Sequence, residues 1–294
     1  MPCYRPLNAW QKAKGAQPQF TPAPIKLQLS CGQCCGCRLE HSRQWAVRCI
    51  HEASLHNDNC FITLTYDDTC LPYGNSLVKG HFQKFMKRLR ARSAPRKVRY
   101  FMCGEYGDEL GRPHFHAILF GYDFRDKSLW TEKEGINLYV SDELDSLWRH
   151  GFATVGEATW ETAAYVSRYV LKKRTGKAKE SHYKRFVEET GEVIDLQPEY
   201  AAMSLKPAIA REWYEAYQSD CFPKDFVTHR GQKYRLPKYY DELLRRDDET
   251  ALEQIKQKRK EQAFAWAFDN TKERLAAKEE CTLARTKQLR RQLT

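Results

Sequence analysis

Two histidines stand one residue apart in the sequence GEYGDELGRPHFHAILFG, which covers residues 104–121. The flanking residues favour two β-strands, and the polar, glycine-containing stretch 108–111 favours a turn, so we expect a hairpin. Alternate residues of a strand share a face, so His114 and His116 point the same way, and the hairpin places Glu105 opposite or diagonal to them. Two imidazoles and one carboxylate suit a divalent ion such as Mg²⁺ or Mn²⁺, with open positions for water and substrate oxygens.

Two alternatives to this metal site stay open. The histidines could be a semi-buried pair that is hydrogen-bonded within a sheet. Amidohydrolase-type barrels also carry His-x-His on a strand, but they need further His and Asp ligands on later strands. The remaining histidines lie mostly in segments predicted as helices or loops, which counts against the barrel.

Two tyrosines in the segment ETAAYVSRYVLKK lie four residues apart, and a helix places Tyr165, Tyr169 and the following Lys172 on one face. A tyrosine hydroxyl beside a cation and facing a metal-bound phosphate can act as a nucleophile, because its phenolate is stabilised. The product would be a phosphotyrosine link and a free 3′-hydroxyl, and two tyrosines allow two successive transfers. The alternative is a pair of amphipathic tyrosines that cover the edge of the core.

The loop CGQCCGCR concentrates cysteines at a spacing that is typical of zinc sites. Cys31, Cys34 and Cys37 are candidate ligands of a structural Zn²⁺, and the sequence does not select a fourth ligand. Three residues could complete the site: Cys3, Cys49 or His41. The alternative is a thiol-rich loop that packs under the following helix.

Composition limits the class of protein. The chain has 294 residues, a formal net charge of +11 and a pI of about 9.1, which favours a polyanionic partner, either nucleic acid or an acidic membrane surface. No stretch is apolar over the ~20 residues that a membrane-spanning helix needs, and the N-terminus shows no secretory signal. We therefore expect a cytoplasmic protein whose cysteines are reduced.

The rest of the sequence predicts the elements that must position these groups. Apolar periodicity indicates helices over 39–56, 77–97, 141–151, 159–177 and 208–220, and β-branched or aromatic runs indicate strands over 61–66, 98–107, 112–123 and 152–158. Helices mixed with a central hairpin favour an α+β fold, with a central antiparallel sheet flanked by helices, over a doubly wound sheet. Residues 1–30 show no steady period and are expected to form an extended arm, and the tail 241–294 lacks Gly and Pro and is expected to be helical or partly disordered.

The second predicted helix should bury Phe82, Phe85, Met86 and Leu89. Its other positions carry basic residues and no acid, which favours phosphate contact over an ordinary solvated face. These basic residues are Lys79, Lys84, Lys87, Arg88, Arg90 and Arg92.

In combination, these motifs resemble the HUH endonucleases of rolling-circle replication. The matching segments are FITLTY, GEYG followed by GRPHFHAILFG, and YVSRYVLKK. A fourth segment, CGQCCGCR leading into WAVRC, is similar to the start of the replication-initiation proteins of small single-stranded DNA phages, the Microviridae of gokushovirus type. The resemblance covers about residues 25–220, and MSLKPAIAREWYEAY also fits it. Arg168 stands where some relatives carry lysine, which keeps the positive charge.

The resemblance implies an HUH or RRM-like palm and a site-specific endonuclease that nicks the viral plus strand, stays attached to the 5′ end and later closes the circle. His114 and His116 match the metal-binding histidines, Tyr165 and Tyr169 the paired nucleophiles, and Lys172 the following lysine, whereas Glu105 rests more on the hairpin argument. The implied domains are a 1–30 arm, a 31–220 HUH endonuclease domain and a 221–294 helical extension. The implied partners are single-stranded origin DNA and host replication proteins such as a helicase, in the cytoplasm of a bacterial host and without a membrane.

Two other functions compete with this one. A plasmid-type relaxase or a transposase would use the same chemistry on other DNA, although a transposase is usually smaller and often carries one tyrosine. A non-catalytic protein could bind nucleic acid through a zinc knuckle and a tyrosine stacking platform. That second function explains the charge, but not why the His, Glu, Tyr and Lys residues occur together.

Overall fold

The computed structural model describes residues 3–13, 15–107, 110–133, 135–169, 182–188 and 190–287. The chain divides into two compact units. One comprises Met1–Gln44 with Cys221–Arg291, and the other is centred on Trp45–Asp220. The boundaries expected from the sequence, at residues 30/31 and 220/221, stay a prediction, because compactness alone does not define an independently folding domain.

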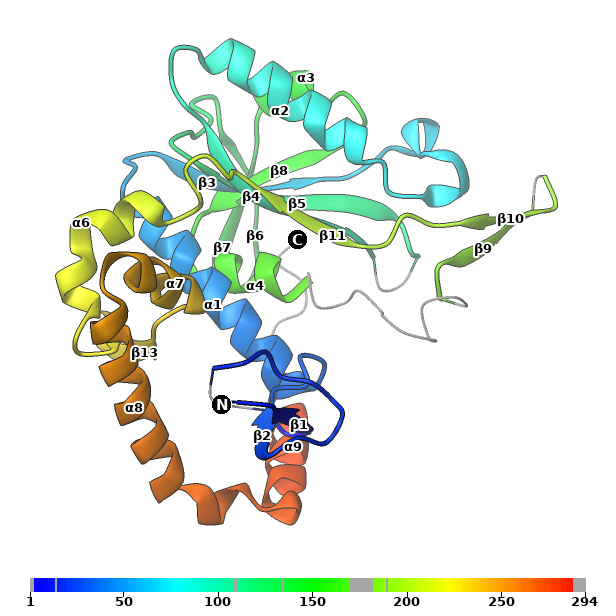
Figure 1. Cartoon of the computed structure of the whole chain (residues 1–294). Helices are drawn as coiled ribbons and strands as arrows, with labels where there is room; N and C mark the ends of the chain where they lie inside the picture. The colour runs from blue at the N-terminus through cyan, green and yellow to red at the C-terminus, as the bar shows by residue number, and fades with distance from the viewer. Residues whose placement is uncertain are drawn as a thin grey trace. The chain divides into compact units, whose positions relative to one another are not determined.

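A seven-stranded antiparallel sheet forms the centre of the second unit, as predicted, and its strands radiate through the middle of Figure 1. In spatial order the strands are β11 (Tyr200–Met203), β4 (Arg99–Tyr106), β5 (Pro113–Phe120), β3 (Asn59–Leu64), β8 (Ala153–Glu157), β7 (Ile136–Val140) and β6 (Ser128–Lys133). Strands β4, β5 and β3 are nearly continuous apolar runs with both faces covered, which explains why they are buried along almost their whole length.

The predicted hairpin is confirmed as β4 and β5. Gly107 N donates to Arg112 O (2.9 Å) and Gly111 N donates to Gly107 O (3.1 Å), and Gly111 adopts a left-handed φ of 59° that suits glycine. This closure sets the register, which pairs Glu105 with His114 and Cys103 with His116. Glu105 therefore lies directly opposite one histidine and diagonal to the other.

One face of the sheet carries the main hydrophobic core. Helices α2 (Lys79–Ser93) and α3 (Asp142–Trp148) cover this face, above the sheet in Figure 1. Phe115 of β5 packs against Phe82 of α2 and Trp148 of α3 (ring centroids 5.8 and 5.7 Å apart). The four α2 residues predicted to be buried are buried: Phe82, Phe85, Met86 and Leu89.

Ser141, the first residue of the predicted helix 141–151, caps helix α3, and its Oγ accepts a hydrogen bond from Leu144 N (3.1 Å). The helix ends at Trp148, before the predicted end at residue 151, because the next residue, Arg149, has a left-handed φ of 64°.

The other face of the sheet, below it in Figure 1, receives the second half of α1 (Cys35–Ala53) and α4 (Trp160–Tyr169). Trp45 of α1 stacks on Phe101 of β4 with ring centroids 4.8 Å apart. Because side chains alternate along a strand, this face also receives Glu105 and both histidines, away from the main core.

Several elements of the second unit were not predicted. Strands β6 and β7 form a hairpin around Gly135 (φ 74°), and the alternation in INLYV beside that glycine was a usable signal. The four-residue strands β9 (Lys184–Val187), β10 (Glu192–Asp195) and β11 are too short to show a period. Helix α6 (Arg211–Cys221) begins three residues later than expected, since Ala210 has a left-handed φ of 63° that interrupts a helix. The described residues of this unit also include two 3-10 turns, η1 (Asp68–Cys70) and η2 (Tyr73–Asn75).

The first unit contains two small sheets and the C-terminal helices. Within residues 1–30, strands β1 (Leu7–Gln11) and β2 (Ile25–Leu29) pair antiparallel. Paired residues such as Leu7 and Leu29 are too far apart in sequence for a local period to reveal the pairing. Strands β12 (Phe226–His229) and β13 (Gln232–Arg235) precede the tail 241–294. The described part of the tail is helical, which is one of the two states expected for it. Its elements are α7 (Lys238–Asp247), which begins just before it, α8 (Glu249–Ala265), η3 (Ala267–Asn270) and α9 (Lys272–Lys287). None of the helices in the described ranges is long and apolar enough to cross a membrane.

Candidate active site

Glu105, His114 and His116 converge on one point of the sheet. The Oε1 atom of Glu105 lies 3.0 Å from Nε2 of His114 and 3.0 Å from Nε2 of His116. The two imidazoles stand nearly perpendicular, with ring centroids 4.9 Å apart. One ligand atom from each residue lies within 4.8 Å of the others, so these side chains can share a single ion. The convergence predicted from the hairpin is therefore present.

Neighbouring groups orient both rings. Nδ1 of His114 lies 3.1 Å from the backbone carbonyl of Arg112, which can only accept, so Nδ1 carries the hydrogen and Nε2 faces Glu105. Nδ1 of His116 lies 3.0 Å from Oγ1 of Thr63, on the adjacent strand β3. Metal-binding histidines are held in this way, with one nitrogen fixed by a protein group and the other directed at the ion.

The charge balance of this cluster favours a cation. A neutral His114 would point an Nε2 lone pair at a carboxylate oxygen, which is unfavourable unless a proton or a metal ion lies between them. Burial raises the pKa of Glu105, but the interactions with the His114 and His116 side chains outweigh that effect and lower the pKa to about 2. The carboxyl group is therefore ionised at neutral pH, and the donor set of two imidazoles and one carboxylate fits a divalent ion.

Access to the cluster is from the side of His114. The side chains of Glu105 and His116 are each 1% exposed, whereas that of His114 is 18% exposed. The cluster thus has a dry interior and one edge that a substrate oxygen can approach, which strengthens electrostatic interactions within it.

Tyr165 contacts this cluster from helix α4. The helix packs on strands β4 and β5 and buries Ala163, Tyr165 and Val166 against the sheet. The tyrosine ring stands edge-on to the His116 imidazole, with centroids 5.1 Å apart and an interplanar angle of 83°. Phe61 of β3 contacts both rings. Its ring stacks on the His116 imidazole, with centroids 5.6 Å apart, and stands edge-on to the Tyr165 ring, with centroids 6.2 Å apart.

The other two predicted residues are less fully described. Tyr169 is the last residue of α4, and its backbone alone is described. Lys172 lies outside the described residues. The structure thus brings Glu105, His114, His116 and Tyr165 together, and the roles of Tyr169 and Lys172 rest on the sequence.

Sequence reasoning missed Thr63, Phe61 and the Arg112 carbonyl. Thr63 and Phe61 alternate along FITLT, but that pattern becomes informative only once β3 is known to pair with β5, which places Thr63 opposite His116. Arg112 acts through its backbone, so its residue type carries no signal, although its guanidinium is held by Tyr66 O (2.7 Å).

The basic face of α2 does not line this cluster, because α2 covers the opposite face of the sheet. Three arginine side chains of α2 form hydrogen bonds or ion pairs with other parts of the protein. Arg88 donates to Leu147 O (2.7 Å) at the end of α3, Arg90 donates to Val98 O (3.2 Å), and Arg92 pairs with Glu143 (3.2 Å). Any phosphate contact by Lys79, Lys84 or Lys87 would therefore be remote from the histidines.

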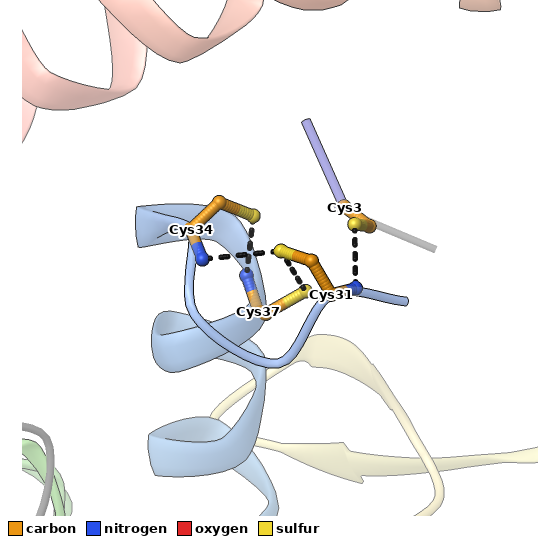
Figure 2. Close-up of side chains that lie close together, drawn as sticks. All are labelled: Cys3, Cys31, Cys34 and Cys37. Atoms are coloured by element: carbon orange, nitrogen blue, oxygen red, sulfur yellow. Dashed lines mark hydrogen bonds between the residues drawn. The ribbon is translucent and has the colours of Figure 1, made fainter. Parts of the chain in front are cut away.

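A second group of metal-binding side chains lies in the first unit. Cys31, Cys34 and Cys37 are joined by Cys3, and the four sulfur atoms lie within 4.8 Å of one another (Figure 2). Of the three residues that could have completed the predicted zinc site, the structure places Cys3 at the cluster. Its separation of 28 residues from Cys31 left no signal in the sequence.

Comparison with known proteins points to replication-associated proteins, both by family model and by individual relatives. The family model described as replication-associated protein ORF2/G2P matches residues 59–174, which begin at β3 and include every residue proposed here for catalysis. No solved structure matches.

Curated relatives share about 30% identity with the chain. They include replication-associated protein VP4 of Bdellovibrio phage phiMH2K, 30% identical over 260 residues that cover 84% of this chain and 78% of the relative. Replication-associated protein ORF2 of Spiroplasma virus 4 is 31% identical over 299 residues that cover 91% of this chain and 88% of the relative. Replication-associated protein ORF4 of Chlamydia phage 1 is 30% identical over 229 residues that cover 74% and 54%.

Proposed function

Since this chain belongs to the family of replication-associated proteins ORF2/G2P, we propose that it nicks single-stranded viral DNA at the plus-strand origin to start rolling-circle replication. The observation that carries the proposal is the position of Tyr165, whose ring lies against His116 while His116 shares a carboxylate oxygen with His114. A nucleophile side chain and a cation-binding cluster thus meet on one face of the sheet. Such a pairing is what metal-assisted phosphodiester transfer requires.

Glu105, His114 and His116 would hold Mg²⁺ or Mn²⁺. When bound there, the ion polarises the scissile phosphodiester and orients its oxygens. Thr63 and the Arg112 carbonyl keep the two Nε2 atoms directed at that position. The buried walls of the cluster exclude water, which favours attack by tyrosine over simple hydrolysis.

The transfer itself conserves atoms and charge. The phenolic oxygen of Tyr165 forms a bond to phosphorus, and the bond between phosphorus and the 3′-oxygen breaks. The tyrosine loses its proton and the 3′-oxygen gains one, which leaves a 5′-phosphotyrosine link and a free 3′-hydroxyl. Lys172, three residues after Tyr169 in the sequence, would stabilise the phenolate.

Tyr169 provides a second transfer. It follows Tyr165 by four residues, so a helix presents both on one side. Tyr169 would attack the regenerated origin, form a second phosphotyrosine link and free a new 3′-hydroxyl. That 3′-hydroxyl would then attack the first phosphotyrosine, which closes the circle and releases Tyr165. The protein would act in the cytoplasm of the bacterial host, together with host replication proteins such as a helicase.

A gel assay for covalent attachment tests this function. The protein is incubated with overlapping single-stranded oligonucleotides that cover the genome encoding it, with Mn²⁺ or Mg²⁺ or with EDTA, and separated under denaturing conditions. We expect a slower protein–DNA band that requires the metal. Glu105→Gln should abolish the band because it keeps the shape of the side chain but removes its charge.

The tyrosine variants and their controls complete the assay. Tyr165→Phe and Tyr169→Phe should each reduce the band and the double variant should abolish it, whereas Tyr217→Phe and His182→Ala, at exposed positions that are not part of the cluster, should not. DNA binding without any adduct would contradict the nickase function and favour a non-catalytic binding protein. An adduct formed only on plasmid or transposon ends would favour a relaxase or transposase.

A further inference from the structure

The four-cysteine cluster of the first unit is separate from the proposed nicking chemistry. Cys3 precedes β1, Cys31 follows β2, Cys34 immediately precedes α1, and Cys37 lies in the first turn of that helix. Figure 2 shows the four side chains turned toward a common centre from these three stretches of chain. Cys3 and Cys34 are 7% and 6% exposed, so the cluster is largely shielded from solvent.

Backbone N–H groups surround the sulfur atoms. Gln33 N and Cys34 N lie 3.5 and 3.3 Å from Sγ of Cys31, and Cys37 N lies 3.5 Å from Sγ of Cys34. This pattern arises because Gly32, with a left-handed φ of 72°, turns the chain around Cys31. N–H donors stabilise a thiolate more than a thiol, so the loop is built to hold negative sulfur.

Two more N–H contacts join the loop to the N-terminal segment. Tyr4 N lies 3.3 Å from Sγ of Cys34, and Cys31 N lies 3.3 Å from Sγ of Cys3. The N-terminal segment is therefore already docked on the loop through its backbone, with Cys3 in place as a fourth ligand.

The start of helix α1 adds a favourable field. Its first turn contains no acidic residue, although acids are commonly favoured there. The positive end of the helix dipole thus faces Cys34 and Cys37, and thiolates at this position would supply the negative charge that the helix lacks.

A disulfide does not account for this arrangement. The sulfur atoms of Cys31 and Cys37 are 4.0 Å apart, about twice the length of a disulfide bond, and all four cysteines are reduced. The C-x2-C-x2-C spacing and a distant fourth cysteine match tetrahedral thiolate coordination instead.

We propose that Cys3, Cys31, Cys34 and Cys37 bind one zinc ion in a closed, four-thiolate site. Binding displaces four thiol protons, and the ion then ties the N-terminal segment to the loop and to the start of α1. All four coordination positions are filled by protein, so the site is structural and has no room for substrate. Its soft sulfur ligands also distinguish it from the imidazole and carboxylate ligands of Glu105, His114 and His116.

The test measures the metal content and ligands of the full-length protein. After expression in zinc-supplemented medium and exhaustive dialysis, we expect about one zinc per chain by mass spectrometry of the metal. X-ray absorption should show four sulfur neighbours at about 2.3 Å. Cys31→Ser and Cys37→Ser should each lose most of this zinc.

The matched control is Cys35→Ser, which changes a cysteine in the same loop that lies outside the cluster. It should retain zinc at the wild-type level. Absence of tightly bound zinc in the wild-type protein would overturn the proposal, whether or not the cysteine variants fold. So would a zinc shell of nitrogen and oxygen neighbours, or equal loss of zinc in Cys35→Ser.

Discussion

The shared carboxylate oxygen of Glu105 determines what the cluster can hold. One anionic oxygen 3.0 Å from two imidazole nitrogens needs a positive charge beside it, either protons or a metal ion. The pairing was predictable because a short turn fixes the register of a hairpin and, with it, the partner of each histidine. The support from Thr63 was not predictable, since it depends on pairing between strands that are 50 residues apart or more.

Thr63→Val tests that support. The substitution keeps the size of the side chain and removes the hydroxyl that contacts Nδ1 of His116. Loss of a group that orients a metal ligand typically weakens metal affinity about 10–100-fold, so we expect that range for Mn²⁺. Mn²⁺ titration followed by electron paramagnetic resonance measures it.

Thr154→Val is the control for this prediction. Thr154 is buried, lies on the neighbouring strand β8 and pairs directly with Thr63. We expect the Mn²⁺ affinity of Thr154→Val to match that of the wild type. If Thr63→Val and Thr154→Val bind Mn²⁺ equally well, Thr63 does not orient His116.

Among the elements, helix α1 and strand β4 are joined by a buried ion pair. Glu52 of α1 is fully buried, pairs with Arg99 of β4 and accepts a hydrogen bond from Ala210 N (2.6 Å). Burial raises the pKa of Glu52, but contacts with His56, Ala210 N and Arg99 lower it overall. The pair therefore anchors the strand that carries Glu105.

Glu52→Gln should destabilise the second unit by about 3–5 kcal/mol, because it leaves Arg99 buried without a counter-charge. Since the folded pKa is depressed, the stabilisation is complete above the unfolded glutamate pKa of about 4.3 and is lost as the pH falls through the lower folded value. Urea unfolding of the wild type and of Glu52→Gln at several pH values measures this effect. The difference between their free energies of unfolding should become smaller as the pH falls. Glu157→Gln, at an exposed position on β8, is the control, and equal stability of the two variants would contradict the anchoring role.

The elements also show where sequence patterns were sufficient. The buried positions of α2 were predictable because four apolar residues repeat at helical spacing. The partners of its arginines were not, because Arg92 meets an acid from α3, 51 residues away, rather than from its own helix. Interpreting the basic helix face from sequence alone therefore overstated the number of side chains that are left for phosphate contact.

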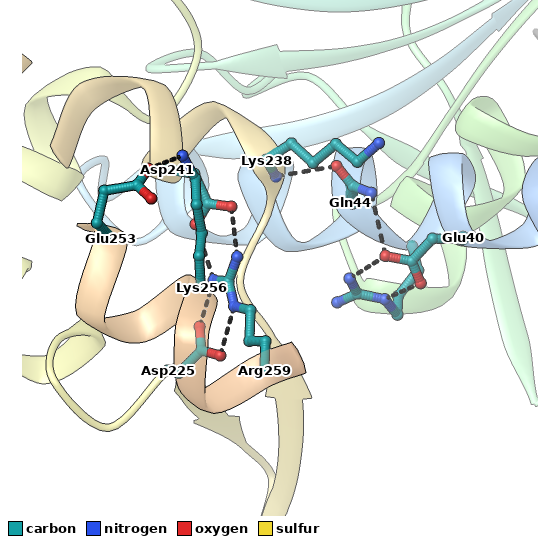
Figure 3. Close-up of polar contacts among 9 residues, drawn as sticks. Glu40, Gln44, Asp225, Lys238, Asp241, Glu253, Lys256 and Arg259 are labelled. Carbon is teal, nitrogen blue, oxygen red and sulfur yellow. Dashed lines mark hydrogen bonds and ion pairs between the residues drawn. The ribbon is translucent and has the colours of Figure 1, made fainter. Parts of the chain in front are cut away.

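At the scale of the whole molecule, the unit that holds the cysteine cluster has its own polar framework. In Figure 3, Arg259 of α8 lies between Asp225 and Asp241 and contacts both carboxylates at 2.5–2.8 Å. These contacts raise the pKa of Arg259 and link α7 and α8 to the chain before β12. The helical nature of this tail was predictable from its lack of Gly and Pro, but its joining with the N-terminal segment was not, because only tertiary contacts reveal it.

The central claim concerns the whole reaction, in which a metal held by the sheet directs a tyrosine of α4 to the DNA. Its most direct test is to trap the covalent adduct, digest it with trypsin and locate the nucleotide by mass spectrometry. Arg168 lies between the two tyrosines, so trypsin separates Tyr165 and Tyr169 into different peptides. We predict metal-dependent nucleotide attachment to one or both of these peptides. Attachment to any other residue, or an adduct that forms equally well in EDTA, would contradict the account.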